Sequence, residues 1–219
     1  IKFDVERDDR HPITVTVIDN GCGMDSLTLR TALRFGGTTR FNDRDGLGRY
    51  GMGLPNSSLS QAQRVTVHTW SSRQGDVLHS YLDLDEIASG LLTEVPKPSH
   101  VQRPIFVNGH NSGTAVTWNR CDRLDNRRIS TISRKLLASL GRRFRYFLWD
   151  GVIITVNGDP VDPIDPLFLH ERSLFNGALQ FAEDMVYEVS VDPQSSSATG
   201  IVRVRFSELP VADWSKLSN

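Results

Sequence analysis

The sequence has few cysteines and no long hydrophobic run. Its 219 residues include two cysteines, Cys22 and Cys121, which lie far apart and belong to no CxxC or Cys/His ligand spacing. A disulfide framework and a zinc site are therefore not supported, and a reducing cytoplasm is the expected location. No apolar run approaches the ~20 residues that span a bilayer, and the N-terminus lacks a basic segment followed by an apolar stretch. We expect no membrane partner.

The sequence also lacks an excess of charge of either sign. It carries 25 Lys and Arg against 26 Asp and Glu, a formal net charge of −1, which gives no global electrostatic reason to expect a nucleic acid partner. Its length allows one sizeable core plus part of a second domain. The chain starts at Ile1 without a methionine and already in an alternating pattern, which indicates a fragment of a longer protein.

Two common phosphate-binding motifs do not fit the chain. No Gly-Lys-Ser/Thr occurs anywhere, which excludes a P-loop. Residues 46–51 match the GxGxxG spacing of dinucleotide-binding domains, but residues 41–45 before them are too polar to form the buried strand that such a site requires. The glycines therefore require a different explanation.

Alternation of apolar and polar residues predicts several strands in the first half of the chain. Residues 1–6 and 13–18 read as a hairpin, and Asp25 is a suitable N-cap for a helix over 26–33. A mobile loop is expected between residues 36 and 48, and an irregular connection between 94 and 111. The other predicted elements are a helix over 55–63 and strands over 64–70, 81–84 and 113–118.

The second half predicts a long helix and two hairpins. Apolar residues recur at helical spacing from Ile129 to Phe144, with Arg and Lys on the remaining positions. We interpret this basic face as solvated, with contact to phosphate or a partner as the alternative. Residues 152–156 are predicted to form a strand that ends in an Asn-Gly turn. Residues 162–166 are predicted to form a proline-stiffened segment by which the chain leaves the first domain. Residues 185–191 and 201–206 are predicted to pair as a hairpin.

The first glycine cluster directly follows the strand predicted over 13–18. Asp19 would lie at the strand end, where its carboxylate can accept a hydrogen bond from the exocyclic amine of adenine and would repel the carbonyl of guanine. Gly21 and Gly23 allow the chain to turn beneath a flat base, and Met24 can form a polarizable wall. An ordinary Asp-Asn-Gly turn is the alternative.

The second glycine cluster runs from Gly48 to Leu54 and precedes a predicted helix. Glycines at 48, 51 and 53 would let backbone N–H groups and the positive end of the helix dipole approach a phosphate. Arg40 and Arg49 are candidate charge partners, and a surface position is the alternative for each.

Three ordered motifs carry a family resemblance. Asp19-x-Gly21-x-Gly23 resembles the adenine-binding box of the gyrase, Hsp90, histidine kinase and MutL (GHKL) ATPase superfamily. Gly48-x-x-Gly51-x-Gly53-Leu54 resembles its phosphate-lid box, and Gly113-Thr114 its third signature, whose threonine binds adenine through water. The pattern is most similar to the Hsp90 and MORC branch and covers roughly residues 1–166.

The resemblance implies an α/β fold, a two-layer sandwich of the Bergerat type with a mixed, mostly antiparallel sheet and helices on one face. It implies an ATP-binding domain over residues 1–172 and the start of a second, transducer-like α/β domain over 173–219. The strand patterns agree with a sheet that is buried on one side.

The resemblance also implies the ligands and the site. ATP or ADP would bind with Mg²⁺, whose asparagine ligand, like the catalytic glutamate, belongs to a helix expected upstream of Ile1. No catalytic residue is therefore assigned here, and whether this chain hydrolyses ATP stays open. The candidate nucleotide-binding residues are Asp19, Gly21, Gly23, Met24, Gly37, Thr38, Arg40, Gly48, Arg49, Tyr50, Gly51, Met52, Gly53, Leu54 and Thr114.

The implied function is an ATP-driven conformational switch that forms a homodimer in the parent protein. DNA or another protein would be contacted through regions outside this chain. The alternatives are a phosphotransferase of the histidine-kinase type and a degenerate nucleotide-binding scaffold.

Overall fold

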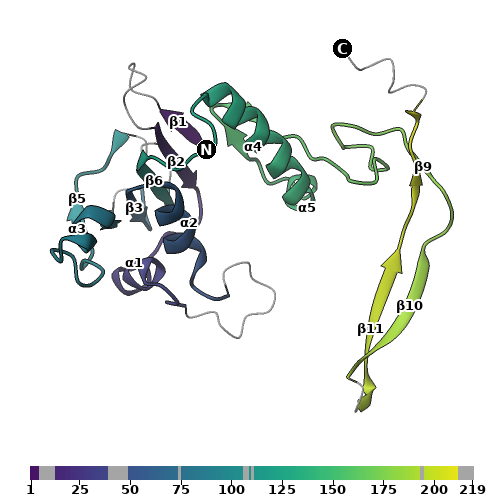
Figure 1. Ribbon diagram of the computed structural model, residues 1–219, viewed down its shortest axis with the longest axis horizontal. Helices are drawn as coiled ribbons and strands as arrows, with labels where there is room; N and C mark the ends of the chain where they lie inside the picture. Colours follow the sequence, from purple (N-terminus) through teal and green to yellow (C-terminus); the bar gives the residue numbers. More distant parts are fainter. Residues whose placement is uncertain are drawn as a thin grey trace. The chain divides into compact units, whose positions relative to one another are not determined.

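A computed structural model describes residues 1–4, 13–38, 49–73, 75–105, 109, 111–192 and 195–211 of the chain. The chain divides into two compact units (Figure 1). The first comprises Ile1–Ile132 with Val156–Gly158, and the second comprises Ser133–Thr155 with Asp159–Asn219. The domain boundary predicted at residue 172 lies within the second unit and stays a prediction.

The first unit is built on a six-stranded sheet in which every described pair of neighbours is antiparallel. The predicted N-terminal hairpin forms its edge, since Phe3 pairs with Val15. The strands, in their order across the sheet, are β1 (Lys2–Asp4), β2 (Ile13–Asp19), β6 (Gly113–Cys121), β3 (Arg64–Trp70), β4 (Val77–Asp83) and β5 (Ser99–Val101).

Helices α1 (Ser26–Leu33) and α2 (Gly53–Gln61) cover one face of this sheet (Figure 1). The predicted cap of α1 is confirmed, because the Asp25 carboxylate accepts the N–H of Thr28 at 2.7 Å. The core between the layers joins Leu29, Leu33 and Leu59 of the helices to Val65, Val67 and Leu82 of the strands. The expected two-layer α/β sandwich is therefore confirmed.

The other face of the sheet carries a second, smaller apolar cluster. Trp70, Val77 and Ala115 are buried there, and His68 lies opposite His79 in the register of β3 and β4. The alternation along β3 places Val65 and Val67 toward the helices, whereas Thr66 and His68 on the other face are only half-buried. A short helix, α3 (Leu84–Ala88), follows β4 and is capped by the Asp83 carboxylate.

Three sequence predictions need correction. The strand predicted over 81–84 begins earlier, at Val77, and ends at Asp83, because Leu84 is the first residue of α3. The segment between 94 and 111 is not wholly irregular, because Ser99–Val101 form β5 and extend the sheet beyond β4. The strand predicted over 152–156 is reduced to β7 (Thr155–Val156), since the N–H of Val152 bonds to the carbonyl of Phe147 at the preceding helix. The predicted Asn157-Gly158 turn does form, with both residues at positive φ (52° and 95°).

The second unit contains the greater part of α4 (Ile129–Arg143), followed by α5 (Arg145–Trp149). The predicted C-terminal hairpin is confirmed as β10 (Met185–Asp192) paired with β11 (Ser195–Val204). Short pairs are formed by β7 with β8 (Asp159–Pro160) and by β9 (Leu179–Gln180) with β12 (Ser207–Glu208). Among the helices in the described residues, none combines the length and apolar character needed to cross a bilayer.

Candidate functional site

The first site cluster forms where β2 ends beside β6. Asp19, the last residue of β2, lies opposite Thr114 in the strand register. Its Oδ1 accepts the N–H of Gly21 at 2.8 Å and the N–H of Thr114 at 3.2 Å. Within the described part of the chain no donor reaches its Oδ2, and the side chain is exposed. The carboxylate is thus fixed by backbone and presents one open acceptor.

A buried hydroxyl that the sequence analysis missed ties this cluster together. Thr69 on β3 is fully buried, and its Oγ1 accepts the N–H of Met24 at 2.8 Å and donates to the carbonyl of Gly113 at 3.1 Å. The hydroxyl of Thr114 lies 3.3 Å away. Threonine is common in strands, so Thr69 does not stand out in the sequence. One signal could have identified it: alternation along the strand places Thr69 on the same covered face as Val67, where a hydroxyl needs a hydrogen-bond partner.

Gly23 is required by a close approach of two backbone segments. It has a φ of +75°, and a Cβ atom at this position would overlap the carbonyl oxygen of Trp70. The next residue, Met24, is half-buried and packs against the helix–sheet core. The structure therefore brings the predicted residues Asp19, Gly21, Met24 and Thr114 together, with Gly23 at the turn between them.

The second cluster joins the end of α1 to the start of α2. The N–H of Gly36 donates to the carbonyl of Gly51 at 3.1 Å, and a Cβ atom on Gly51 would overlap the carbonyl oxygen of Gly37. Gly37 and Gly51, both predicted site residues, thus lie against each other, and Thr38 directly follows. The predicted residues Arg40 and Gly48 lie outside the described residues.

The N-terminus of α2 is left without a side-chain cap. Met52 occupies the cap position but makes no side-chain hydrogen bond, and the first turn contains no acidic residue. In the described residues the N–H groups of Gly53 and Leu54 have no acceptor, and Pro55 has no N–H to offer. Two backbone donors and the positive end of the helix dipole are therefore open to an anion.

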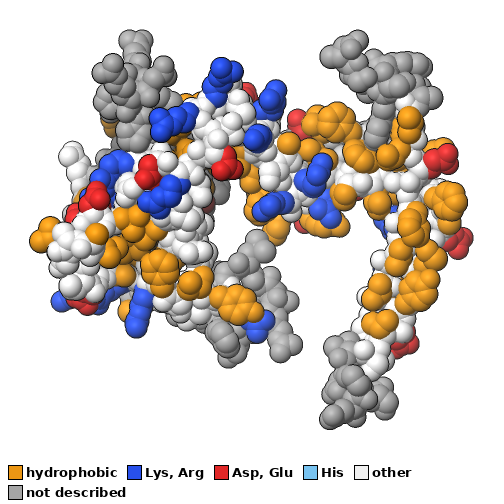
Figure 2. Space-filling view, in the orientation of Figure 1, with side chains coloured by type: hydrophobic (Ala, Val, Ile, Leu, Met, Phe, Trp, Pro, Cys, Tyr) orange, Lys and Arg blue, Asp and Glu red, His pale blue; other side chains and the backbone are white. Residues whose placement is uncertain are grey.

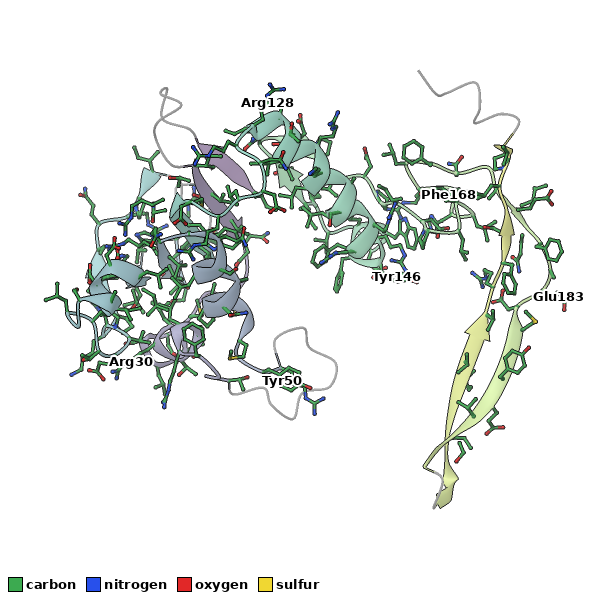
Figure 3. The ribbon with its side chains drawn as sticks, in the orientation of Figure 1. Arg30, Tyr50, Arg128, Tyr146, Phe168 and Glu183 are labelled. Carbon is green, nitrogen blue, oxygen red and sulfur yellow. The ribbon has the colours of Figure 1, made fainter. Side chains whose placement is uncertain are left out.

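Arg49 and Tyr50 precede this helix. The guanidinium of Arg49 lies over the ring of Tyr50, 5.6 Å from its centroid. Tyr50 is 64% exposed, and its side chain extends away from the sheet (Figure 3). This geometry gives neither side chain an assigned role in the site, and both stay predictions.

Metal ligands are not evident in the described ranges. No group of three or more His, Cys, Asp or Glu side chains in them is arranged to hold a metal ion. A surface hollow of about 490 Å³ lies elsewhere, at the start of α4, and shares no residue with the two clusters; it is lined by Asp125, Asn126, Arg127, Arg128 and Thr131. The chemistry that the two clusters offer is hydrogen bonding to an amine at one and to an anion at the other.

Comparison with known proteins matches the part of the chain that holds both clusters to a known family. Residues 1–114, which include both clusters and end at Thr114, match a family model described as "Histidine kinase-, DNA gyrase B-, and HSP90-like ATPase". No curated protein matches the chain. One similar solved structure contains the ATPase and transducer domains of DNA topoisomerase II from Balamuthia mandrillaris, at 15% identity and a TM-score of 0.49. The match covers 74% of this chain and 42% of that one.

Proposed function

The chain belongs to the family of histidine kinase-, DNA gyrase B- and HSP90-like ATPases, and we propose that its first unit binds ATP through Asp19 and the N-terminus of α2. The observation that carries this proposal is the Asp19 carboxylate. Its Oδ1 is held by two backbone N–H groups while Oδ2 faces no donor among the described residues. A fixed, open acceptor of this kind suits a ligand that presents an amine.

Adenine has the required donor. Its exocyclic amine would donate to Oδ2 of Asp19, whereas guanine would place a carbonyl oxygen against the same carboxylate. Thr114 would add a water-mediated contact through its hydroxyl, which lies 3.3 Å from that of Thr69. Gly21 and Gly23 would leave room for the ring, and Met24 would contact its face.

The open end of α2 suits the phosphates. The N–H groups of Gly53 and Leu54 would donate to phosphate oxygens, and the helix dipole would stabilise their charge. Mg²⁺ would accompany the phosphates and neutralise part of their charge. Since the described residues contain no carboxylate cluster for it, we assign no metal ligand within them.

We further propose that nucleotide binding drives a conformational switch of the Hsp90 and MORC type. Support comes from the backbone contact between Gly36 and Gly51, which holds both ends of the intervening segment beside α2. A phosphate at Gly53 would therefore act directly on that segment. The switch would promote homodimerisation of the parent protein, and hydrolysis would reset it.

The proposal is tested by the variant Asp19→Asn, titrated with ATP and GTP by calorimetry. The substituted amide keeps a carbonyl oxygen as the acceptor for the N–H groups of Gly21 and Thr114 but turns an NH₂ group toward adenine. Because a hydrogen bond to a charged group contributes about 1.5–3 kcal/mol, ATP affinity should fall by about 10- to 100-fold and the preference over GTP should shrink.

Asp25→Asn is the matched control for this experiment. Asp25 lies close in sequence and is also exposed, but its carboxylate only caps α1. ATP binding by this variant should equal that of the wild type. Unchanged ATP affinity and selectivity in Asp19→Asn, or no ATP binding by the wild-type chain, would contradict the proposal.

A further inference from the structure

The part of α4 that belongs to the second unit is strongly basic. Between Ser133 and Trp149 the chain contains no Asp or Glu, although the protein as a whole has a net charge of −1. Figure 2 shows Lys and Arg side chains gathered over the position of α4 and α5. The basic residues are Arg134, Lys135, Arg142, Arg143 and Arg145.

Packing fixes which side of this helix faces outward. Gly141 is buried, its carbonyl accepts the N–H of Ile164 at 3.0 Å, and a Cβ atom there would overlap the carbonyl oxygen of Asp162. Ser133 and Gly141 are the buried residues of α4, whereas four of its cations are exposed. Among these cations, Lys135 and Arg142 are seven residues apart, close to two helical turns, so they lie on one line about 10 Å apart. We call these four side chains the basic band: Arg134, Lys135, Arg142 and Arg143.

Within the described residues, no carboxylate neutralises the charges of the basic band. No Asp or Glu in the described residues forms a salt bridge with any of its four members. Arg64 and Arg120 of the first unit contrast with them, because each pairs with the buried carboxylate of Asp83. Uncompensated like charges on one helix repel one another, and an anionic partner removes that repulsion.

Helix electrostatics explain only part of the basic band. Arg142 and Arg143 lie in the last turn of α4, where cations stabilise the negative end of the helix dipole. Arg134 and Lys135 lie in the middle of the helix, where the dipole gives no such benefit. The helix dipole therefore does not account for these two cations.

We propose that the basic band binds the phosphate backbone of duplex DNA without sequence selectivity. A duplex carries one charge per ~1.7 Å of its axis, so the ~10 Å between Lys135 and Arg142 faces several phosphates. Protein interfaces depend on apolar anchors, and membrane-binding helices insert apolar side chains. The exposed residues between Lys135 and Arg142 are Ala138 and Ser139, which provide neither, and the exposed aromatic residues of this segment, Tyr146 and Phe147, lie beyond the basic band in α5.

Arg145, the first residue of α5, adds a cation in a fixed position next to the basic band. The guanidinium of Arg145 donates to the carbonyl of Arg142 at 2.8 Å and lies over the ring of Tyr146, 4.3 Å from its centroid. Tyr146 is 60% exposed, and its side chain points outward from α5 (Figure 3). The positive surface therefore continues past the end of α4.

The test measures fluorescence anisotropy of a labelled duplex of about 30 base pairs, without nucleotide, over ~50–200 mM salt. Lys135→Gln with Arg142→Gln should weaken binding at least ~10-fold and lower the slope of log K against log salt by about 2, since each phosphate contact contributes ~0.9. The charge-retaining pair Lys135→Arg with Arg142→Lys should bind like the wild type.

The matched control removes two exposed cations from the first unit, Arg73→Gln with Lys97→Gln, neither of which forms a salt bridge among the described residues. It should keep wild-type affinity for DNA. An equal loss in this control, or wild-type binding by Lys135→Gln with Arg142→Gln, would overturn the proposal. So would a wild-type chain that binds phosphatidylserine vesicles but not the duplex.

Discussion

The variant Gly53→Ala tests whether the glycine at position 53 is needed for ligand binding or for folding. A Cβ atom added at Gly53 would meet no atom of the described residues within 4 Å. Gly53 is also the first residue of α2, where alanine is the better helix former. The structure therefore predicts that this variant folds, with an unfolding free energy unchanged or raised by up to about 1 kcal/mol.

The same methyl group would stand where we place the phosphates. If the N–H of Gly53 donates to a phosphate oxygen, the added Cβ atom crowds the anion or shifts it away from the donor. Loss of one charge-assisted hydrogen bond, about 1.5–3 kcal/mol, would weaken ATP binding by about 10- to 100-fold. Stability and affinity should thus move in opposite directions.

Urea unfolding and calorimetric titration with ATP measure the two effects separately. Asn56→Ala, an exposed position one turn further along α2, is a control for the change in helix propensity. It should leave ATP affinity unchanged. Wild-type affinity in Gly53→Ala would refute the placement of phosphate at this helix, and a large loss of stability would refute the open space beside Gly53.

Three further outcomes are expected. Thr69→Val removes a hydroxyl that makes two hydrogen bonds in the interior, so urea unfolding should show a loss of about 2–4 kcal/mol in the free energy of unfolding. The control Thr66→Val, on the same strand, removes one half-buried hydrogen bond and should lose under ~1 kcal/mol. Gly23→Ala should destabilise the chain more than Gly36→Ala in the same assay, because both have positive φ but only the first also overlaps backbone. Burial, with the nearby His79, lowers the pKa of His68 to about 4. The unfolded chain therefore binds a proton from about pH 6.5 downward that the folded chain excludes, and urea midpoints should fall between about pH 6.5 and 4, less steeply in His68→Asn.

Local signals made much of the first unit predictable. The bounds of β3 agree with the β-branched run of residues 64–70, and those of α1 agree with the N-cap signal at Asp25. Asp19 could be assigned to the end of β2 because an apolar strand ends there. Each of these features depends on residues that are adjacent in sequence.

The features that sequence did not predict depend on contacts between distant segments. Thr69 bonds to residues 45 and 44 positions away, and no local pattern distinguishes it from other strand threonines. Three-residue β5 exists only because β4 offers it an edge. Val152 and Ile153 have strand-forming side chains, but the N–H of Val152 donates to the carbonyl of Phe147 in α5 and is therefore not available to a strand partner.

Packing alone accounts for two of the glycines in the motifs. Gly23 lies against the carbonyl of Trp70 and Gly51 against that of Gly37, so the protein's own backbone excludes a side chain at both positions. These glycines would be required in this fold whether or not a nucleotide binds. They support the fold, and through it the family, but they say little about the ligand.

The polar groups left open beside those glycines carry the functional argument. A helix start is usually capped by Ser, Thr, Asp or Asn, whereas α2 has Met52 at that position and leaves the N–H groups of Gly53 and Leu54 without a partner in the described residues. Asp19 likewise keeps one oxygen open within that part of the chain. Without a ligand, water can satisfy such groups, since Asp19 and Gly53 are exposed. ATP has an amine that can donate to Asp19 and phosphates that can accept from the N–H groups of Gly53 and Leu54. One ligand would therefore satisfy both clusters.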